Sequence, residues 1–72
     1  MIIDKNPVLD MDNLTVTVNN NIDTTEEVEI YINGLLSLLT EDFVDITDNI
    51  ITVTEGDIDF LLDSIFVSYT KI

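Results

Sequence analysis

Residues 24–39 read TTEEVEIYINGLLSLL, and whether they form a helix or strands sets the fold class of the chain. The spacing predicts a helix. Thr24 followed by Glu27 matches a capping box. Apolar residues recur at the i, i+3, i+4 and i+7 positions of one helical face, namely Val28, Tyr31, Ile32, Leu35, Leu36 and Leu39. Gly34 lowers the helix propensity by about 1 kcal/mol relative to alanine. A competing interpretation makes residues 28–32 a strand and starts the helix near Gly34.

The residues before this segment indicate a single strand. In residues 13–18, NLTVTV, the apolar side chains of Leu14, Val16 and Val18 alternate with two threonines, as in a half-buried strand. The three asparagines at 19–21 predict a turn. Residues 1–12 are expected to be irregular, because the Asn6-Pro7 pair disfavours a regular element.

The residues after it predict a second strand and a second helix. Residues 40–48 form an acidic connector with room for a helical turn, and residues 49–54 have the composition of a strand. Thr54 is placed to cap a helix over residues 55–66, whose core face is made of Ile58, Leu61, Leu62 and Ile65. Residues 66–72 extend this helix or form a third strand, and propensity favours the strand.

Together these elements predict one α+β domain over residues 1–72, with two helices packed on a small β-sheet. Phe60 lies opposite the core face of the second helix, so it packs either under the 40–48 connector or against a second chain. A chain of 72 residues buries a modest core, and its net charge of -13 costs further stability by self-repulsion. We therefore expect a homodimer.

Composition excludes several classes of function. The chain has no Cys and no His, so it lacks the usual ligands of zinc, haem and iron–sulfur clusters and the usual general base near neutral pH. It has no Arg, and Lys5 and Lys71 are the only two basic residues beside 15 acidic ones, which argues against direct binding of nucleic acid. No enzyme activity, cofactor or metal is expected. The Asp-x-Asp pairs at Asp10 and Asp57 do not continue as a calcium-binding loop.

Nothing in the sequence directs the chain to a membrane. Residues 1–10 lack the basic and apolar regions of a signal peptide, and the apolar stretch at 35–39 is far too short to span a bilayer. A cytoplasmic protein is expected.

The layout of the acidic residues is the remaining candidate for function. On the predicted second helix, Glu55, Asp59 and Asp63 follow at i, i+4 and i+8, in steps of about 6 Å. A second acidic string in the connector contains Asp42, Asp45 and Asp48, with Asp57 nearby. Like charges at this spacing destabilise a helix, so we expect these seven residues to bind a partner. The alternative is an ordinary solvated acidic surface.

In size, charge and interleaved carboxylates the chain resembles the small acidic DNA-mimic proteins, many of them encoded by bacteriophages. The resemblance covers the whole chain and includes no shared motif. It implies an inhibitor that occupies the basic DNA-binding surface of a bacterial host protein and excludes DNA, with the histone-like nucleoid protein HU as the first target. Two alternative functions stay open: a small acidic structural or assembly component of a phage particle or another complex, and an antitoxin-like or anti-repressor protein that binds one basic partner without imitating DNA.

Overall fold

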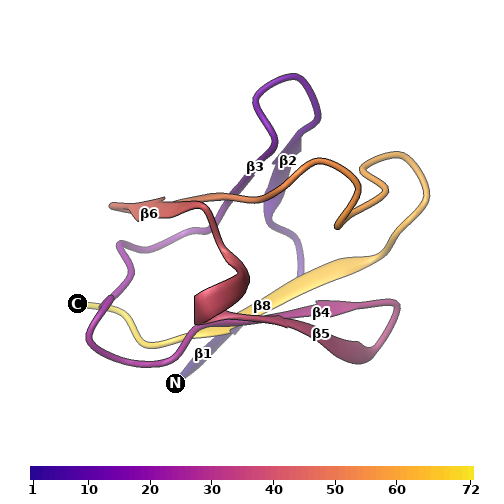
Figure 1. Ribbon diagram of the computed structural model, residues 1–72. Helices are drawn as coiled ribbons and strands as arrows, with labels where there is room; N and C mark the ends of the chain where they lie inside the picture. The colour runs from indigo at the N-terminus through magenta and orange to yellow at the C-terminus, as the bar shows by residue number, and fades with distance from the viewer.

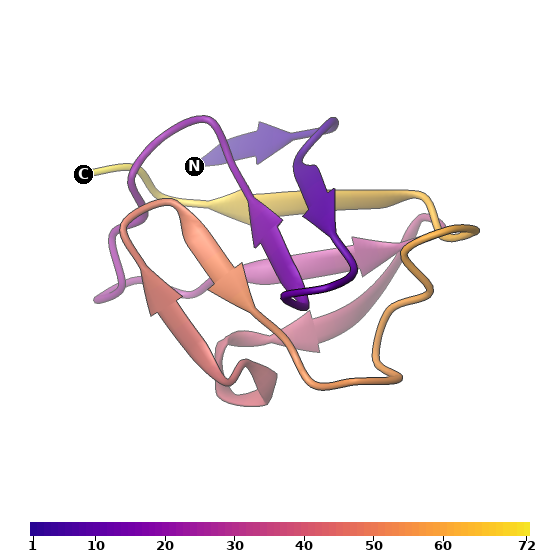
Figure 2. The same ribbon diagram turned by 90° about the horizontal axis from the view of Figure 1, so that it is seen from above.

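Two antiparallel four-stranded sheets make up the computed structural model, which describes residues 1–72. Sheet I has the strand order β1 (Ile2–Asp4), β8 (Ile65–Tyr69), β4 (Glu29–Ile32) and β5 (Leu35–Leu39). Sheet II has the order β2 (Val8–Asp10), β3 (Thr15–Thr17), β7 (Ile50–Thr52) and β6 (Asp45–Thr47). The sheets lie one above the other in Figure 1, and the strands of sheet II cross those of sheet I diagonally in Figure 2. The fold is a β-sandwich.

The core lies between the two sheets and follows the two-residue period of their strands. Sheet I contributes Ile30, Val67 and Tyr69, and sheet II contributes Val16 and Ile51, all fully buried. The chain passes between the sheets at both edges. A short connection joins β1 to β2, and the 3-10 helix η1 (Thr40–Asp42) leads from β5 towards β6. No helix in the structure is long and apolar enough to cross a membrane.

The predicted α+β fold is wrong, because the structure contains no α-helix and most of its regular elements are strands. In residues 24–39 the turn chemistry outweighs the helical period. Asn33 and Gly34 both have positive φ, 54° and 86°, and the hairpin they form pairs Ile32 with Leu35. An Asn-Gly pair favours this type of two-residue hairpin turn. The competing strand interpretation of residues 28–32 was therefore closer to the structure, although a second strand, not a helix, follows Gly34.

The second predicted helix, residues 55–66, is also wrong. These residues form a loop that leads into β8. Only Ile58 and Ile65 of the predicted core face are buried, whereas Leu61 and Leu62 are 77% and 82% exposed. The side chains of Asp59 and Asp63 accept backbone N–H groups within this loop. Such local hydrogen bonds compete with a helix, which explains why an acidic segment with good helical spacing does not become one.

Several local predictions are confirmed. Strand β3 lies within residues 13–18, and β7 lies within residues 49–54. Val16 and Val18 are buried, as the alternation required. Residues 66–69 of the last segment belong to strand β8, and the acidic connector contains the helical turn η1, although it also holds the strand β6, which was not predicted. The prediction that residues 1–12 are irregular is wrong, because they hold β1 and β2; Pro7 lies between the two strands, where its missing N–H removes no hydrogen bond from a sheet.

Two buried polar side chains fasten the turn at residues 19–21 to sheet I. Asp4 is 6% exposed, and its carboxylate accepts the N–H groups of Asn6 and Asn19, each at 3.0 Å. The hydroxyl of the fully buried Tyr69 accepts the backbone N–H of Asn20 at 3.2 Å and its side-chain Nδ2–H at 3.1 Å. These bonds satisfy the Asp4 carboxylate and the Tyr69 hydroxyl, whose burial without partners would destabilise the fold.

Candidate partner-binding surface

The acidic helical stripe does not exist, because its residues lie in the loop between β7 and β8. Glu55 and Asp57 are exposed near the start of this loop. Asp59 Oδ1 accepts the N–H groups of Leu61 and Leu62 at 3.0 and 3.2 Å. Asp63 Oδ2 accepts the N–H of Asp59 at 2.9 Å. Two of the predicted binding carboxylates therefore shape the loop.

The same loop is locked to the hairpin between β4 and β5. The side chain of Asn33 donates to Asp63 Oδ1 at 3.0 Å and accepts the N–H of Ser64 at 2.9 Å. The backbone N–H of Asn33 donates to the carbonyl of Ser64 at 2.8 Å. Asn33 thus forms the hairpin turn and also holds the loop that precedes β8. Reversing the charge of Asp63 would disturb this lock as well as the surface charge.

The other predicted residues lie along the β6 edge of sheet II. Asp42 ends η1, where its Oδ2 accepts the N–H of Leu39 at 2.9 Å. Asp45 begins β6 and accepts the hydroxyl of Thr47 at 2.6 Å. Asp48 occupies the turn between β6 and β7 with φ 55°, a conformation that Asp and Asn adopt more readily than most residues. All three side chains are exposed.

Strand pairing places threonines in the middle of the outer face of sheet II. One row across the four strands is Asp10, Thr15, Thr52 and Asp45, and the neighbouring row is Val8, Thr17, Ile50 and Thr47. Their neighbours along the strands, such as Val16 and Ile51, point into the core. We call this outer face the threonine face, after Thr15, Thr17, Thr47 and Thr52.

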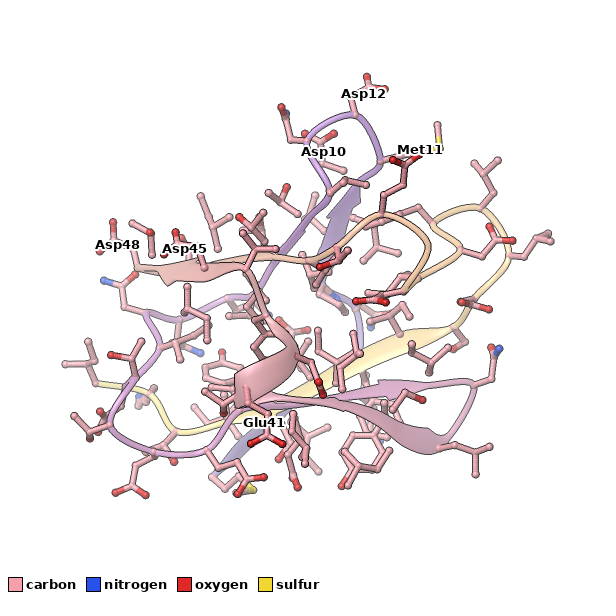
Figure 3. All side chains as sticks on the ribbon, in the orientation of Figure 1. Asp10, Met11, Asp12, Glu41, Asp45 and Asp48 are labelled. Atoms are coloured by element: carbon pink, nitrogen blue, oxygen red, sulfur yellow. The ribbon has the colours of Figure 1, made fainter.

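Carboxylates stand at both edges of the threonine face. Asp10 and Asp45 end one row on opposite edge strands, three strand spacings or roughly 14 Å apart. Asp12 extends the acidic edge beyond Asp10, and Asp48 extends the edge beyond Asp45. Figure 3 shows these four side chains on the upper side of the molecule, whereas Glu41 lies on η1 below them. The two lysines belong to neither edge, because Lys5 lies between β1 and β2 and Lys71 near the C-terminus.

Hydrogen bonds stabilise the ionised form of Asp10. The side chain of Asn13 donates to Asp10 Oδ2 at 2.7 Å, and the N–H groups of Asn13 and Asp12 donate to Oδ1 at 3.2 and 3.0 Å. The pKa of Asp10 is lowered, first by the Asn13 side chain and then by the backbone bonds, which outweigh desolvation. One carboxylate at the face's edge is therefore both negative and fixed in position.

The outer face of sheet I has a different character. Register places Phe66, Tyr31 and Leu36 side by side on neighbouring strands. The rings of Phe66 and Tyr31 stack with centroids 4.6 Å apart and planes 7° from parallel. Ile3 and Leu36 are 55% and 49% exposed on this side of the sheet. The two outer faces therefore differ mainly in charge and hydroxyl groups: the threonine face has carboxylates at its edges and also exposes Val8 and Ile50, whereas the outer face of sheet I is mostly apolar.

Asp10, Asp12 and the threonine face were not found from the sequence. The alternation of Thr15 and Thr17 placed both on one side of a strand, but the pairing with Thr52 depends on a register between residues far apart in the chain.

No group of three or more His, Cys, Asp or Glu side chains is arranged to hold a metal ion. No protein-family model, curated protein or solved structure was found to match the chain.

Proposed function

We propose that this protein binds the basic DNA-binding surface of a bacterial protein through the threonine face and excludes DNA, acting in the host cytoplasm. The observation that carries the proposal is the arrangement of sheet II. Its two central strands present Thr15, Thr17, Thr52 and Ile50, its edge strands carry carboxylates, and the face has no basic side chain.

The spacing of the two acidic edges supports mimicry of a duplex. The estimated separation of roughly 14 Å between the edge strands is close to the ~12 Å width of the major groove of B-DNA. The net charge of -13 matches about 13 phosphates, or roughly 6–7 base pairs. Lysine and arginine side chains of a DNA-binding protein can pair with both edges, and the threonine hydroxyls between them can accept further hydrogen bonds.

The resemblance to DNA-mimic proteins makes HU the first partner to test, because its basic arms and two-fold symmetry suit a short acidic ligand. Charge pairing supplies most of the binding in this proposal, so affinity falls steeply between low and physiological salt. A merely solvated acidic surface would show no preference for one face, and this difference makes the proposal testable.

The test is displacement of a fluorescent DNA duplex from purified HU, followed by anisotropy. The informative variant is the double reversal Asp12→Lys and Asp45→Lys, which changes both edges of the threonine face. Both side chains are exposed, and neither carboxylate accepts a backbone N–H bond. The matched control is Glu26→Lys with Glu27→Lys, which changes the net charge by the same amount in the exposed loop before β4.

We expect the parent and the control to displace DNA and the edge variant to lose at least about tenfold in potency, since two reversed ion pairs each cost on the order of 1 kcal/mol. Equal potency of the edge and control variants would refute a role for the threonine face. Failure of the parent to displace DNA would refute HU as the target. The assay is then repeated with proteins captured from bacterial lysate.

A second candidate function is a small acidic assembly component of a phage particle or another complex. The apolar outer face of sheet I favours it, because exposed apolar patches mark interaction surfaces. A second copy of this chain is the first occupant to consider. Two chains that each carry a net charge of -13 can pack through this face with little repulsion. Glu29 is the only acidic residue that β4, β5 and β8 contribute to it. Co-purification with particles, without displacement of DNA, would favour the assembly role.

A further inference from the structure

A preformed cavity lies beside the acidic edge that contains Asp10 and Asp12. It has a volume of about 470 Å³ and is bounded by the loop between β2 and β3 and by residues 55–61. Leu14, Ile58 and Phe60 supply apolar lining, and Met11 and Leu61 add further apolar side chains. Two acidic residues, Glu55 and Asp59, also line it.

Both walls of the cavity are held by hydrogen bonds. On one side, Asp10 fixes the turn through Asp12 and Asn13, and the carbonyl of Leu14 accepts the N–H of Val53 at 2.9 Å. On the other, Asp59 accepts the N–H groups of Leu61 and Leu62. The cavity therefore exists before any partner arrives, and a ligand need not order these loops.

The lining matches a side chain that is apolar along its length and positive at its end. Met11 is 51% exposed and Leu61 is 77% exposed, so both offer apolar surface that a ligand can cover. Lysine and arginine combine an aliphatic stem with a cationic head. The stem would pack on Met11, Phe60 and Leu61, and the head would reach Glu55.

A second cavity has acidic residues but little apolar lining, and it serves as a comparison for the first. It has a similar volume, about 430 Å³, and lies between the loop before β4 and η1. Glu26, Glu27 and Glu41 line it, but Leu39 is its one apolar lining residue. It thus has more acidic lining residues and almost no apolar ones. A ligand chosen by charge alone would prefer this cavity, whereas an amphipathic cation would prefer the one that contains Phe60.

We propose that the cavity between the β2–β3 loop and residues 55–61 receives a lysine or arginine side chain from a basic segment of the partner. The inference rests on the proposed function for the nature of the partner and adds an anchor point outside the threonine face. A cationic side chain seated there would fix the register in which the partner lies across the acidic edges.

The experiment is an NMR titration of the intact protein with short capped peptides that contain one central arginine or one central lysine. The neutral controls carry citrulline or norleucine at that position, which keep a similar side-chain length without the charge. We expect saturable shifts at the Met11 and Leu61 methyl groups, with smaller effects around Glu41. The neutral peptides should bind about threefold more weakly or worse, as the loss of an exposed ion pair predicts.

Two variants of the cavity and one matched control locate the contact. Glu55→Gln removes an exposed cavity charge and should weaken the cationic peptides about twofold to fivefold, whereas the matched variant Glu27→Gln in the other cavity should leave their affinity unchanged. Leu61→Ser should weaken charged and neutral peptides alike, because it removes apolar contact. An unchanged amide spectrum away from the substitution verifies that each variant is folded.

The outcomes separate this inference from the proposed function. Shifts centred on Glu41, equal binding of the neutral peptides or indifference to Glu55→Gln would each overturn the cavity proposal. If this protein displaces DNA but its cavity does not bind the cationic peptides, the cavity proposal is overturned and the proposed function is retained. Cavity binding with the expected preferences, but without displacement of DNA from any captured protein, would support the cavity and refute the proposed function.

Discussion

The substitution Gly34→Ala distinguishes a hairpin from a helix by the sign of its effect. In a helix, alanine would stabilise residues 24–39 by about 1 kcal/mol relative to glycine. In the observed turn, Gly34 has φ 86°, where a side chain carries a conformational cost of about 1–2 kcal/mol. A Cβ atom at this position meets no heavy atom within 4 Å, so steric contact with other residues adds nothing to this cost. We expect a net destabilisation of about 1 kcal/mol, after the smaller gain from a stiffer unfolded chain.

Thermal and urea unfolding of the two proteins, followed by circular dichroism at fixed concentration, measures this difference. One kcal/mol corresponds to a fall in Tm of about 4–8 °C for a domain of this size. Gly34→Asn is the matched control, because asparagine tolerates the left-handed conformation and should cost clearly less than alanine. A higher Tm for Gly34→Ala would refute the hairpin and favour the helix.

Three further outcomes follow from the structure. Asn33→Ala and Asp63→Ala should each lower the free energy of unfolding in urea by about 1–2 kcal/mol. The double variant should lose less than the sum of the two, because the two side chains share a hydrogen bond. Strictly additive losses would contradict this contact. The pKa of Asp10 is depressed in the folded state, so its contribution to stability is fully present above its ordinary value of 3.8 and is lost as the pH falls through the folded pKa. The difference in free energy of unfolding between the parent and Asp10→Asn should therefore shrink below about pH 4. A difference that grows on acidification would show that folding raises the pKa of Asp10 and does not lower it. In analytical ultracentrifugation at tens of micromolar we expect a homodimer that salt strengthens and Leu36→Lys dissociates, whereas a mass of 8.1 kDa for the parent in 0.15 M salt would exclude it.

The strands that could be predicted are those whose local pattern has one interpretation. The alternation around Val16 and the β-branched residues near Ile51 specify strands without help from the rest of the chain. Residues 24–39 satisfy a helical period and a strand period at once, since Val28, Ile30 and Ile32 also alternate. In that conflict the Asn33-Gly34 pair is the better guide, because it specifies a backbone geometry whereas periodicity specifies only a face.

The candidate site was less predictable than the fold, for a different reason. The sequence does not show whether an acidic residue is a free surface charge or an acceptor that shapes a turn. Asp59 and Asp63 are acceptors of backbone N–H groups. Asp4 is a further acidic residue whose role no sequence pattern indicates; it is buried, and its carboxylate accepts the N–H of Asn19. The threonine face requires the register between β3 and β7, which local residue patterns do not specify.

The position of β8 has a consequence for when the protein can fold. This strand is the last of the eight along the chain, yet it lies inside sheet I, between β1 and β4. During synthesis, β1 must therefore wait with its backbone groups unpaired until residues 65–69 have left the ribosome. Closing so long a loop is slow compared with forming the β4–β5 hairpin. The dense negative charge would keep the nascent chains apart through that delay.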